Sequence, residues 1–138
     1  TREDRLNEIA DYVGWLDALQ DEAFRAVPRE RVQATVLGFS QGTATACRWV
    51  AFGRVRADRL VLWGWSAPPD LDLATFRARL GEAPVILVAR RQDPATPAAR
   101  IDEELARLHG AGIRAEVRWF EGGHQLDEAV LRDLGGNA

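Results

Sequence analysis

Two periodicities of apolar residues alternate along the chain. From residue 4 to residue 20 the apolar positions recur every three or four residues, with Asp, Glu and Arg between them, which is the spacing of an amphipathic helix. Four later runs are nearly all apolar and rich in β-branched residues, as in strands that are buried on both faces. We predict these strands at Val32–Phe39, Arg59–Trp65, Val85–Ala89 and Ile113–Phe120.

The segments between the predicted strands are typical of helices. Gln41–Phe52 and Leu126–Leu134 have helical apolar spacing, and 71–80 is a shorter amphipathic segment. Thr96 and Pro97 are a helix start, with Thr as the N-cap and Pro at the first helical position. This alternation predicts the α/β class, with a parallel sheet of about four strands and helices on both faces. We find no linker, repeat or low-complexity tract, and expect one domain over 1–138.

The composition narrows the classes of function. Hydrophobic residues make up 46% of the chain, charged residues 28%, and the net charge is −3, which suits a globular protein and argues against a nucleic-acid surface. No apolar stretch approaches 18 residues, so we expect no membrane span. The single Cys47 excludes an internal disulfide. We expect a buried structural thiol in a reducing, cytoplasmic environment.

The chain begins at Thr1 and contains no Met. It therefore lacks a translation start, and we expect either a processed protein or a piece of a longer one.

The segment Gly38–Gly42 reads Gly-Phe-Ser-Gln-Gly and lies between a predicted strand and a predicted helix. This is the pattern of a nucleophile elbow, a sharp turn that exposes a serine above the sheet. Side chains at Gly38 and Gly42 would collide across such a turn. Ser40 would then lie at a helix N-terminus, where the dipole and free N–H groups favour negative charge. The alternative is an ordinary tight turn between a strand and a helix.

Two further polar residues follow later strands. Asp93 comes shortly after the third predicted strand, and His124 comes shortly after the fourth. The carboxyl ends of parallel strands meet at one edge of a sheet, so we expect Ser40, Asp93 and His124 to lie close together. Their order along the chain is that of α/β-hydrolases. Histidine can take the serine proton, and the aspartate can orient the imidazole.

Each of these residues also has a simpler explanation. Asp-Pro is more often a turn than a catalytic acid, and a loop histidine can be structural. Asp70, Asp72 and Asp127 are alternative acids, which we rank below Asp93. His109 ends a predicted helix, where a surface cation is the simpler interpretation.

The residues of these three segments resemble one family. Gly38–Gly42, the run from Gln92 to Pro97, and Glu121–His124 are similar to the phospholipase/carboxylesterase family of α/β-hydrolases, which includes bacterial carboxylesterases and acyl-protein thioesterases. The resemblance spans nearly the whole chain. It implies Ser40 as nucleophile, His124 as base, Asp93 as the orienting acid, and the Gln41 N–H as an oxyanion donor.

The chain also departs from that family. Members usually have about four further strands at the N-terminus and an early glycine-rich loop that supplies a second oxyanion N–H. Nothing here matches that loop. The family's strand order would leave Val32–Phe39 at the sheet edge, where an apolar strand is a pairing hazard. We therefore expect either a homodimer through this edge or a fragment without its N-terminal strands.

Aromatic residues near the elbow suggest how a substrate would bind. Alternation along the second strand predicts Trp63 and Trp65 on one face, with Trp65 and Phe39 as substrate contacts and 68–80 as a small lid. Trp63 and Trp65 packing under a helix is the alternative. The sequence contains no metal or dinucleotide motif, so no cofactor is implied. We expect a serine carboxylesterase for short-chain esters, with a thioesterase, a lysophospholipase and a non-catalytic remnant as alternatives.

Overall fold

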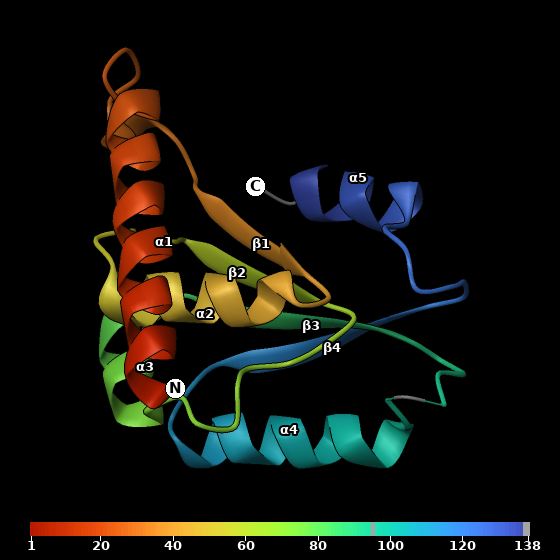
Figure 1. Ribbon diagram of the computed structural model, residues 1–138. Helices are drawn as coiled ribbons and strands as arrows, with labels where there is room; N and C mark the ends of the chain where they lie inside the picture. The colour runs from red at the N-terminus through yellow and green to blue at the C-terminus, as the bar shows by residue number, and fades with distance from the viewer. Residues whose placement is uncertain (95, 137–138) are drawn as a thin grey trace.

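The protein is built on a parallel sheet. The computed structural model describes residues 1–94 and 96–136, and in them four strands follow the order β1-β2-β3-β4 (Figure 1). All three neighbouring pairs are parallel. The strands are β1 (Thr35–Phe39), β2 (Arg59–Trp63), β3 (Val85–Arg90) and β4 (Ala115–Phe120).

Helices cover both faces of the sheet, as the sequence predicts. The described helices are α1 (Arg2–Ala23), α2 (Gly42–Phe52), α3 (Leu73–Leu80), α4 (Ala98–Gly110) and α5 (Glu128–Gly136). One apolar cluster joins α2, α3 and α4 to one face of the sheet. A second cluster joins α5 to the other face. Because both faces are buried, β2 and β3 are almost entirely apolar.

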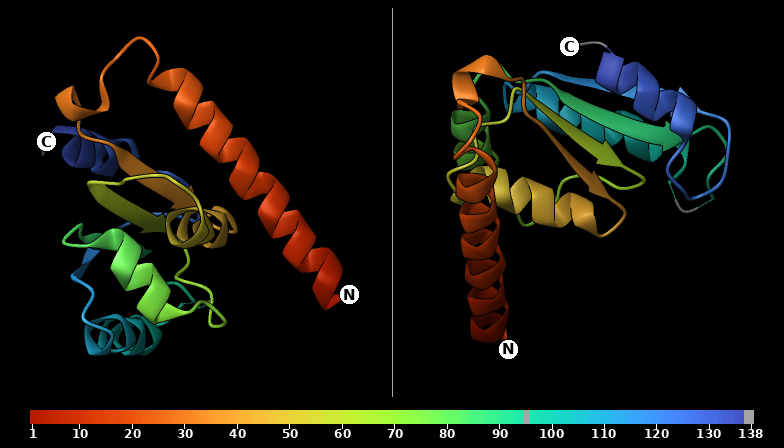
Figure 2. Two further views of the ribbon diagram at one scale, coloured as in Figure 1. Left: turned by 90° about the vertical axis from the view of Figure 1, so that its left-hand side faces the viewer. Right: turned by 90° about the horizontal axis from the view of Figure 1, so that it is seen from above.

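Helix α1 packs on α2 and stands off the sheet (Figure 2). Its described residues include just two buried ones, Val13 and Asp17. The Asp17 carboxylate accepts hydrogen bonds from the Trp49 indole at 2.9 Å and from the Arg54 backbone N–H at 2.8 Å. These polar contacts anchor a helix that buries little apolar surface.

Four predicted strand boundaries are wrong. β3 extends to Arg90 instead of ending at Ala89, and β4 starts at Ala115 instead of Ile113. The other two have local reasons. Arg29–Arg31 forms a 3₁₀ turn, and β1 starts at Thr35 instead of Val32. β2 ends at Trp63 because Gly64 has a φ of 78°, which leaves the extended conformation. Trp63 is buried under α5, whereas Trp65 is 50% exposed, so the prediction that both lie on one strand face is wrong.

Two further details differ from the expectations. α4 begins at Ala98 with Pro97 as its N-cap, one residue later than predicted from Thr96. In segment 68–80, Phe76 and Leu80 are buried in the core shared with α2. The segment is therefore part of the core and does not form a lid.

The edges of the sheet are β1 and β4, and β1 is the edge strand that the family resemblance implied. Among the described residues, no helix combines the length and the apolar character that crossing a bilayer requires.

Candidate active site

Ser40 lies in a strained turn between β1 and α2. Its φ of 56° is the one positive value among the described non-glycine residues. Such a conformation costs about 1–3 kcal/mol, so the surroundings must hold it. The Ser40 N–H donates to the Trp63 carbonyl at 2.8 Å, and the Ser40 carbonyl accepts from the Thr43 N–H at 3.2 Å.

The close approach of β1 and α2 explains one of the two elbow glycines. A Cβ on Gly38 would lie 2.4 Å from the Gly42 carbonyl oxygen, so no side chain fits at that position. A Cβ on Gly42 would meet nothing within 4 Å. The predicted requirement for two glycines is therefore right for Gly38 and wrong for Gly42.

Thr43 fixes the elbow from inside. It is fully buried, and its hydroxyl lies 2.8 Å from the Ser40 carbonyl and 3.2 Å from the Ser66 carbonyl. The hydroxyl thereby connects the elbow to the loop after β2. Sequence reasoning missed this residue, since a threonine in the first turn of a helix is unremarkable by itself.

The imidazole of His124 lies beside the Ser40 hydroxyl. Nε2 is 3.0 Å from Oγ, a hydrogen-bond distance across 84 residues of sequence. The hydroxyl donates to Nε2 when the imidazole proton is on Nδ1. The Phe39 ring lies 5.2 Å from the imidazole ring, centroid to centroid, and backs it from β1. A Cβ on Gly64 would lie 3.0 Å from Cε1 and 3.3 Å from Nδ1, so this glycine leaves room for the ring.

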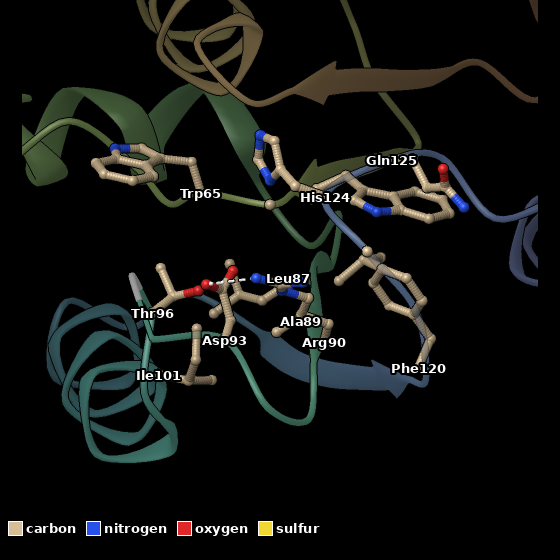
Figure 3. Close-up of a pocket in the computed structure, with 14 residues that line it drawn as sticks. Trp65, Leu87, Ala89, Arg90, Asp93, Thr96, Ile101, Phe120, His124 and Gln125 are labelled. Atoms are coloured by element: carbon tan, nitrogen blue, oxygen red, sulfur yellow. Dashed lines mark hydrogen bonds and ion pairs between the residues drawn. The ribbon is translucent and has the colours of Figure 1, made fainter.

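Asp93 lies in the same pocket as His124, on the opposite wall (Figure 3). It is 9% exposed. Its Oδ1 lies 3.2 Å from the Arg90 guanidinium, and this ion pair is the dashed contact of Asp93 in Figure 3. The structure thus brings Ser40 and His124 into contact. It places Asp93 in the pocket that His124 lines, paired with Arg90. Sequence reasoning assigned no role to Arg90, although it directly follows the predicted third strand.

The alternative acids have other partners. Asp70 pairs with Arg5 and Arg48. Asp72 caps α3, and hydrogen bonds from the Thr75 hydroxyl and the Ala74 N–H lower the pKa of its carboxyl. These contacts account for both acids without a catalytic role.

Three remaining polar candidates also have structural partners. The Asp127 carboxylate accepts from the Val130 N–H at the start of α5. Nε2 of His109 lies 2.8 Å from the Ala115 carbonyl, in an exposed position. Cys47 is fully buried, and this burial raises the pKa of its thiol to about 12, as expected of a structural cysteine.

Gln41 follows Ser40 directly and caps the N-terminus of α2. Backbone N–H groups in the first turn of a helix have no intrahelical acceptor, and the helix dipole favours negative charge there. The geometry of this helix end thus suits an anion next to the Ser40 hydroxyl. Among the described residues, no cluster of three His, Cys, Asp or Glu side chains could hold a metal ion.

The pocket between His124 and Asp93 is narrow. Its free volume is about 10 Å³, roughly the room that one water needs. It is therefore too small for an acyl chain. Trp65 lines this pocket and also a larger hollow of about 330 Å³ that runs toward α4, with Ser66, Pro69 and Arg100 among its walls.

Solved structures show the same fold. The chain matches a single-residue variant of SOBER1 from Arabidopsis thaliana with a TM-score of 0.70 and 19% identity, over 93% of this chain and 62% of that one. It matches the Bacillus cereus carboxylesterase with a TM-score of 0.67 and 21% identity, over 94% and 60%. It matches a phospholipase/carboxylesterase of Dyadobacter fermentans with a TM-score of 0.53 and 16% identity, over 90% of this chain and 62% of that one. The sequence matches no protein-family model and no curated protein.

The chain thus spans about three fifths of the length of the solved structures that it matches. At these identities the likeness concerns the fold. The four-stranded parallel sheet with helices on both faces is that of the α/β-hydrolases, in the form seen in carboxylesterase-type structures.

Proposed function

We propose that this protein is a serine hydrolase that acts on small carboxylic esters. One observation carries the proposal: Ser40, held in a strained turn at a helix N-terminus, has its Oγ 3.0 Å from Nε2 of His124. A serine hydroxyl is a weak nucleophile at neutral pH and needs an adjacent base. This pair provides both groups in contact, on the fold of known carboxylesterase structures.

The proposed reaction has two stages. His124 takes the Ser40 proton as Oγ attacks the ester carbonyl, and then returns a proton to the departing alcohol. Water attacks the resulting acyl-enzyme with His124 again as the base. Asp93 is the acid we assign to the imidazolium, because it shares the pocket with His124 and the competing acids are bound elsewhere.

The oxyanion is assigned to the N-terminal end of α2. The Gln41 N–H is the proposed donor, because it follows the nucleophile at the positive end of the helix dipole. Loss of one oxyanion donor typically lowers turnover by about 10²–10³-fold. A site with Gln41 alone would therefore be slow, and a second donor would speed it.

Trp65 and Phe39 are the proposed substrate contacts. Trp65 is half exposed at the entrance of the hollow toward α4, and Phe39 is partly buried against His124. The bulk of Trp65 favours short acyl chains. The same catalytic groups would serve a thioesterase or a lysophospholipase with a wider pocket, and a non-catalytic remnant is the alternative from another class.

We also propose that the free edge of β1 pairs with a second copy of the chain. β1 is an edge strand, and Leu37 on it is 38% exposed. An edge strand offers unpaired N–H and C=O groups to a neighbouring strand. Sedimentation at two or more concentrations tests this, and a monomer throughout would contradict it.

Hydrolysis of p-nitrophenyl acetate, butyrate and octanoate by the parent chain and by Ser40→Ala tests the function. We expect activity in the parent, highest on acetate, and its loss in the variant. A fluorophosphonate probe should label Ser40 in the parent and not in His124→Ala. A folded parent with neither activity nor labelling would support the remnant. Trp65→Ala should extend activity to octanoate, and an unchanged chain-length profile would remove Trp65 from the pocket.

A further inference from the structure

Asp93 carries its charge in a nearly closed environment. Its side chain is 7% exposed, and the Arg90 side chain that pairs with it is 26% exposed. Arg90 is the last residue of β3, so the guanidinium and the carboxylate share one short turn. Arginine stays protonated at all ordinary pH values, and the pair therefore persists wherever the carboxylate is ionised.

His124 faces this pair from across the pocket (Figure 3). Its Nε2 is directed to Ser40, and its Nδ1 lies on the side of Gly64. Among the described residues that line the pocket, the charged or titratable ones are Arg90, Asp93 and His124.

Other charges near this pocket are paired at the surface. Arg91 and Glu121 form an ion pair at 3.2 Å, with side chains 60% and 79% exposed. The Asp127 carboxylate accepts a hydrogen bond from the Val130 N–H of α5. Arg90 is therefore the cation that shares the interior of the pocket with Asp93 and His124.

Packing alone does not explain Arg90. Within the described part of the chain, its Nε is buried and has no hydrogen-bond partner. A buried donor without an acceptor is unfavourable for folding, and this cost is specific to an arginine at this strand end. This imbalance points to a role in the pocket.

Arg90 and Asp93 act on the imidazole in opposite directions. A carboxylate stabilises the imidazolium that forms when His124 takes the serine proton, and a guanidinium destabilises it. A carboxylate that already accepts a charge-assisted hydrogen bond from Arg90 also has less capacity left for Nδ1–H.

We infer that Arg90 is a positioning residue: it holds Asp93 on the wall of the pocket and shares that carboxylate with His124. It thereby limits how strongly Asp93 supports the histidine as a base. The effect on rate rests on the proposed hydrolase function, whereas the effect on the titration of His124 does not.

The first experiment follows the two histidines by NMR during a pH titration. The chain has only His109 and His124, so the signals can be assigned with His124→Ala. In Arg90→Met and Arg90→Gln we expect the His124 midpoint to move up by about one pH unit, because the cation is lost and Asp93 no longer shares its carboxylate with Arg90. Arg90→Lys keeps the charge and should move it far less. Arg91→Met is the matched control and should leave it unchanged.

Asp93→Asn separates the two causes. In the Asp93→Asn background, Arg90→Met removes only the repulsion between the guanidinium and the His124 imidazolium. The upward shift of the His124 midpoint should therefore be less than half of the shift that Arg90→Met causes in the parent chain. Equal shifts in the two backgrounds would overturn the inference, as would no shift or a downward shift in both neutral variants.

Kinetics then complete the test on p-nitrophenyl acetate. The acid limb of the kcat/KM profile in Arg90→Met should follow the NMR shift, with the plateau raised severalfold. The two ideas fail separately: activity that survives Ser40→Ala would refute the hydrolase, and an unmoved His124 titration would refute the role of Arg90.

Discussion

The elbow and the histidine loop carry the two halves of the proposed chemistry and are held in different ways. At the elbow, Ser40 is fixed by backbone hydrogen bonds, a buried Thr43 hydroxyl and the contact between Gly38 and α2. In the loop after β4, His124 is exposed, and its described contacts are the Ser40 hydroxyl and the Phe39 ring.

This difference separates stability from activity. A strained turn persists only if the surrounding structure over-determines it, so the turn that carries Ser40, the proposed nucleophile, is packed against the core. A base that must exchange protons and contact water can lie on a lightly held loop. Changes at the elbow should therefore affect folding and activity together, and changes around His124 should affect activity alone.

The largest expected effect is on activity, in His124→Ala. Removal of the base should lower kcat/KM by about 10³-fold or more, because general base catalysis is lost. The stability should change by less than about 0.5 kcal/mol, because the side chain is exposed. His109→Ala, with an exposed histidine bound to the Ala115 carbonyl, is the control and should keep full activity. A loss of stability in His124→Ala would contradict the expectation that changes around His124 affect activity alone.

The next effect is on folding, in Gly38→Ala. The new Cβ would meet the Gly42 carbonyl oxygen at 2.4 Å, so β1 and α2 must move apart. We expect a loss of about 3 kcal/mol in urea unfolding, together with lost activity. Gly42→Ala places a Cβ in open space at the first turn of α2 and should be neutral or slightly stabilising. Equal behaviour of the two variants would refute the described elbow.

Gly64→Ala tests the boundary between the two regions. The new Cβ would press on the imidazole of His124 at 3.0 Å. We expect kcat/KM to fall by about 10²-fold, because a small misplacement of the base suffices.

The backbone strain of Gly64→Ala should cost about 1 kcal/mol, because φ is +78°. Gly81→Ala also puts a side chain at a positive φ, +59°, with nothing near the new Cβ, and is the control for backbone strain. It should lose at least as much stability and keep its activity.

The smallest effect concerns Asp58, at the amino ends of the strands. A hydrogen bond from the Ala34 N–H, helped by Arg29, lowers the pKa of its carboxyl from 3.8. The pKa of this carboxyl is lower in the folded protein than in the unfolded chain, so the ionised carboxylate stabilises the fold at pH values above its unfolded pKa. This contribution is lost as the pH falls through the folded pKa.

Asp58→Asn should therefore destabilise the protein at pH 7 by about 0.5 kcal/mol, after allowance for solvent screening, and by less at pH 2, below the ordinary pKa of the carboxyl. Urea unfolding at the two pH values measures this. A loss that is the same at both would show that the ionised carboxylate is not the cause.

Periodicity predicts elements better than it predicts their ends. The apolar runs identified all four strands and the order of the helices, because burial on both faces leaves a continuous apolar pattern. The end of β2 was missed, because a left-handed Gly64 has no signature in an apolar run. After this glycine Trp65 is exposed, so the alternation of side chains along a strand does not predict its position.

The sequence by itself determined the α/β class, the elbow at Ser40 and the choice of His124 near it, because these depend on local spacing and on the edge at which parallel strands end. Only the tertiary structure showed that Arg90 pairs with Asp93. Arg90 reaches that carboxylate from the preceding strand end, whereas the imidazole stands across the pocket. Which donor a buried carboxylate takes depends on distances that no spacing along the chain encodes.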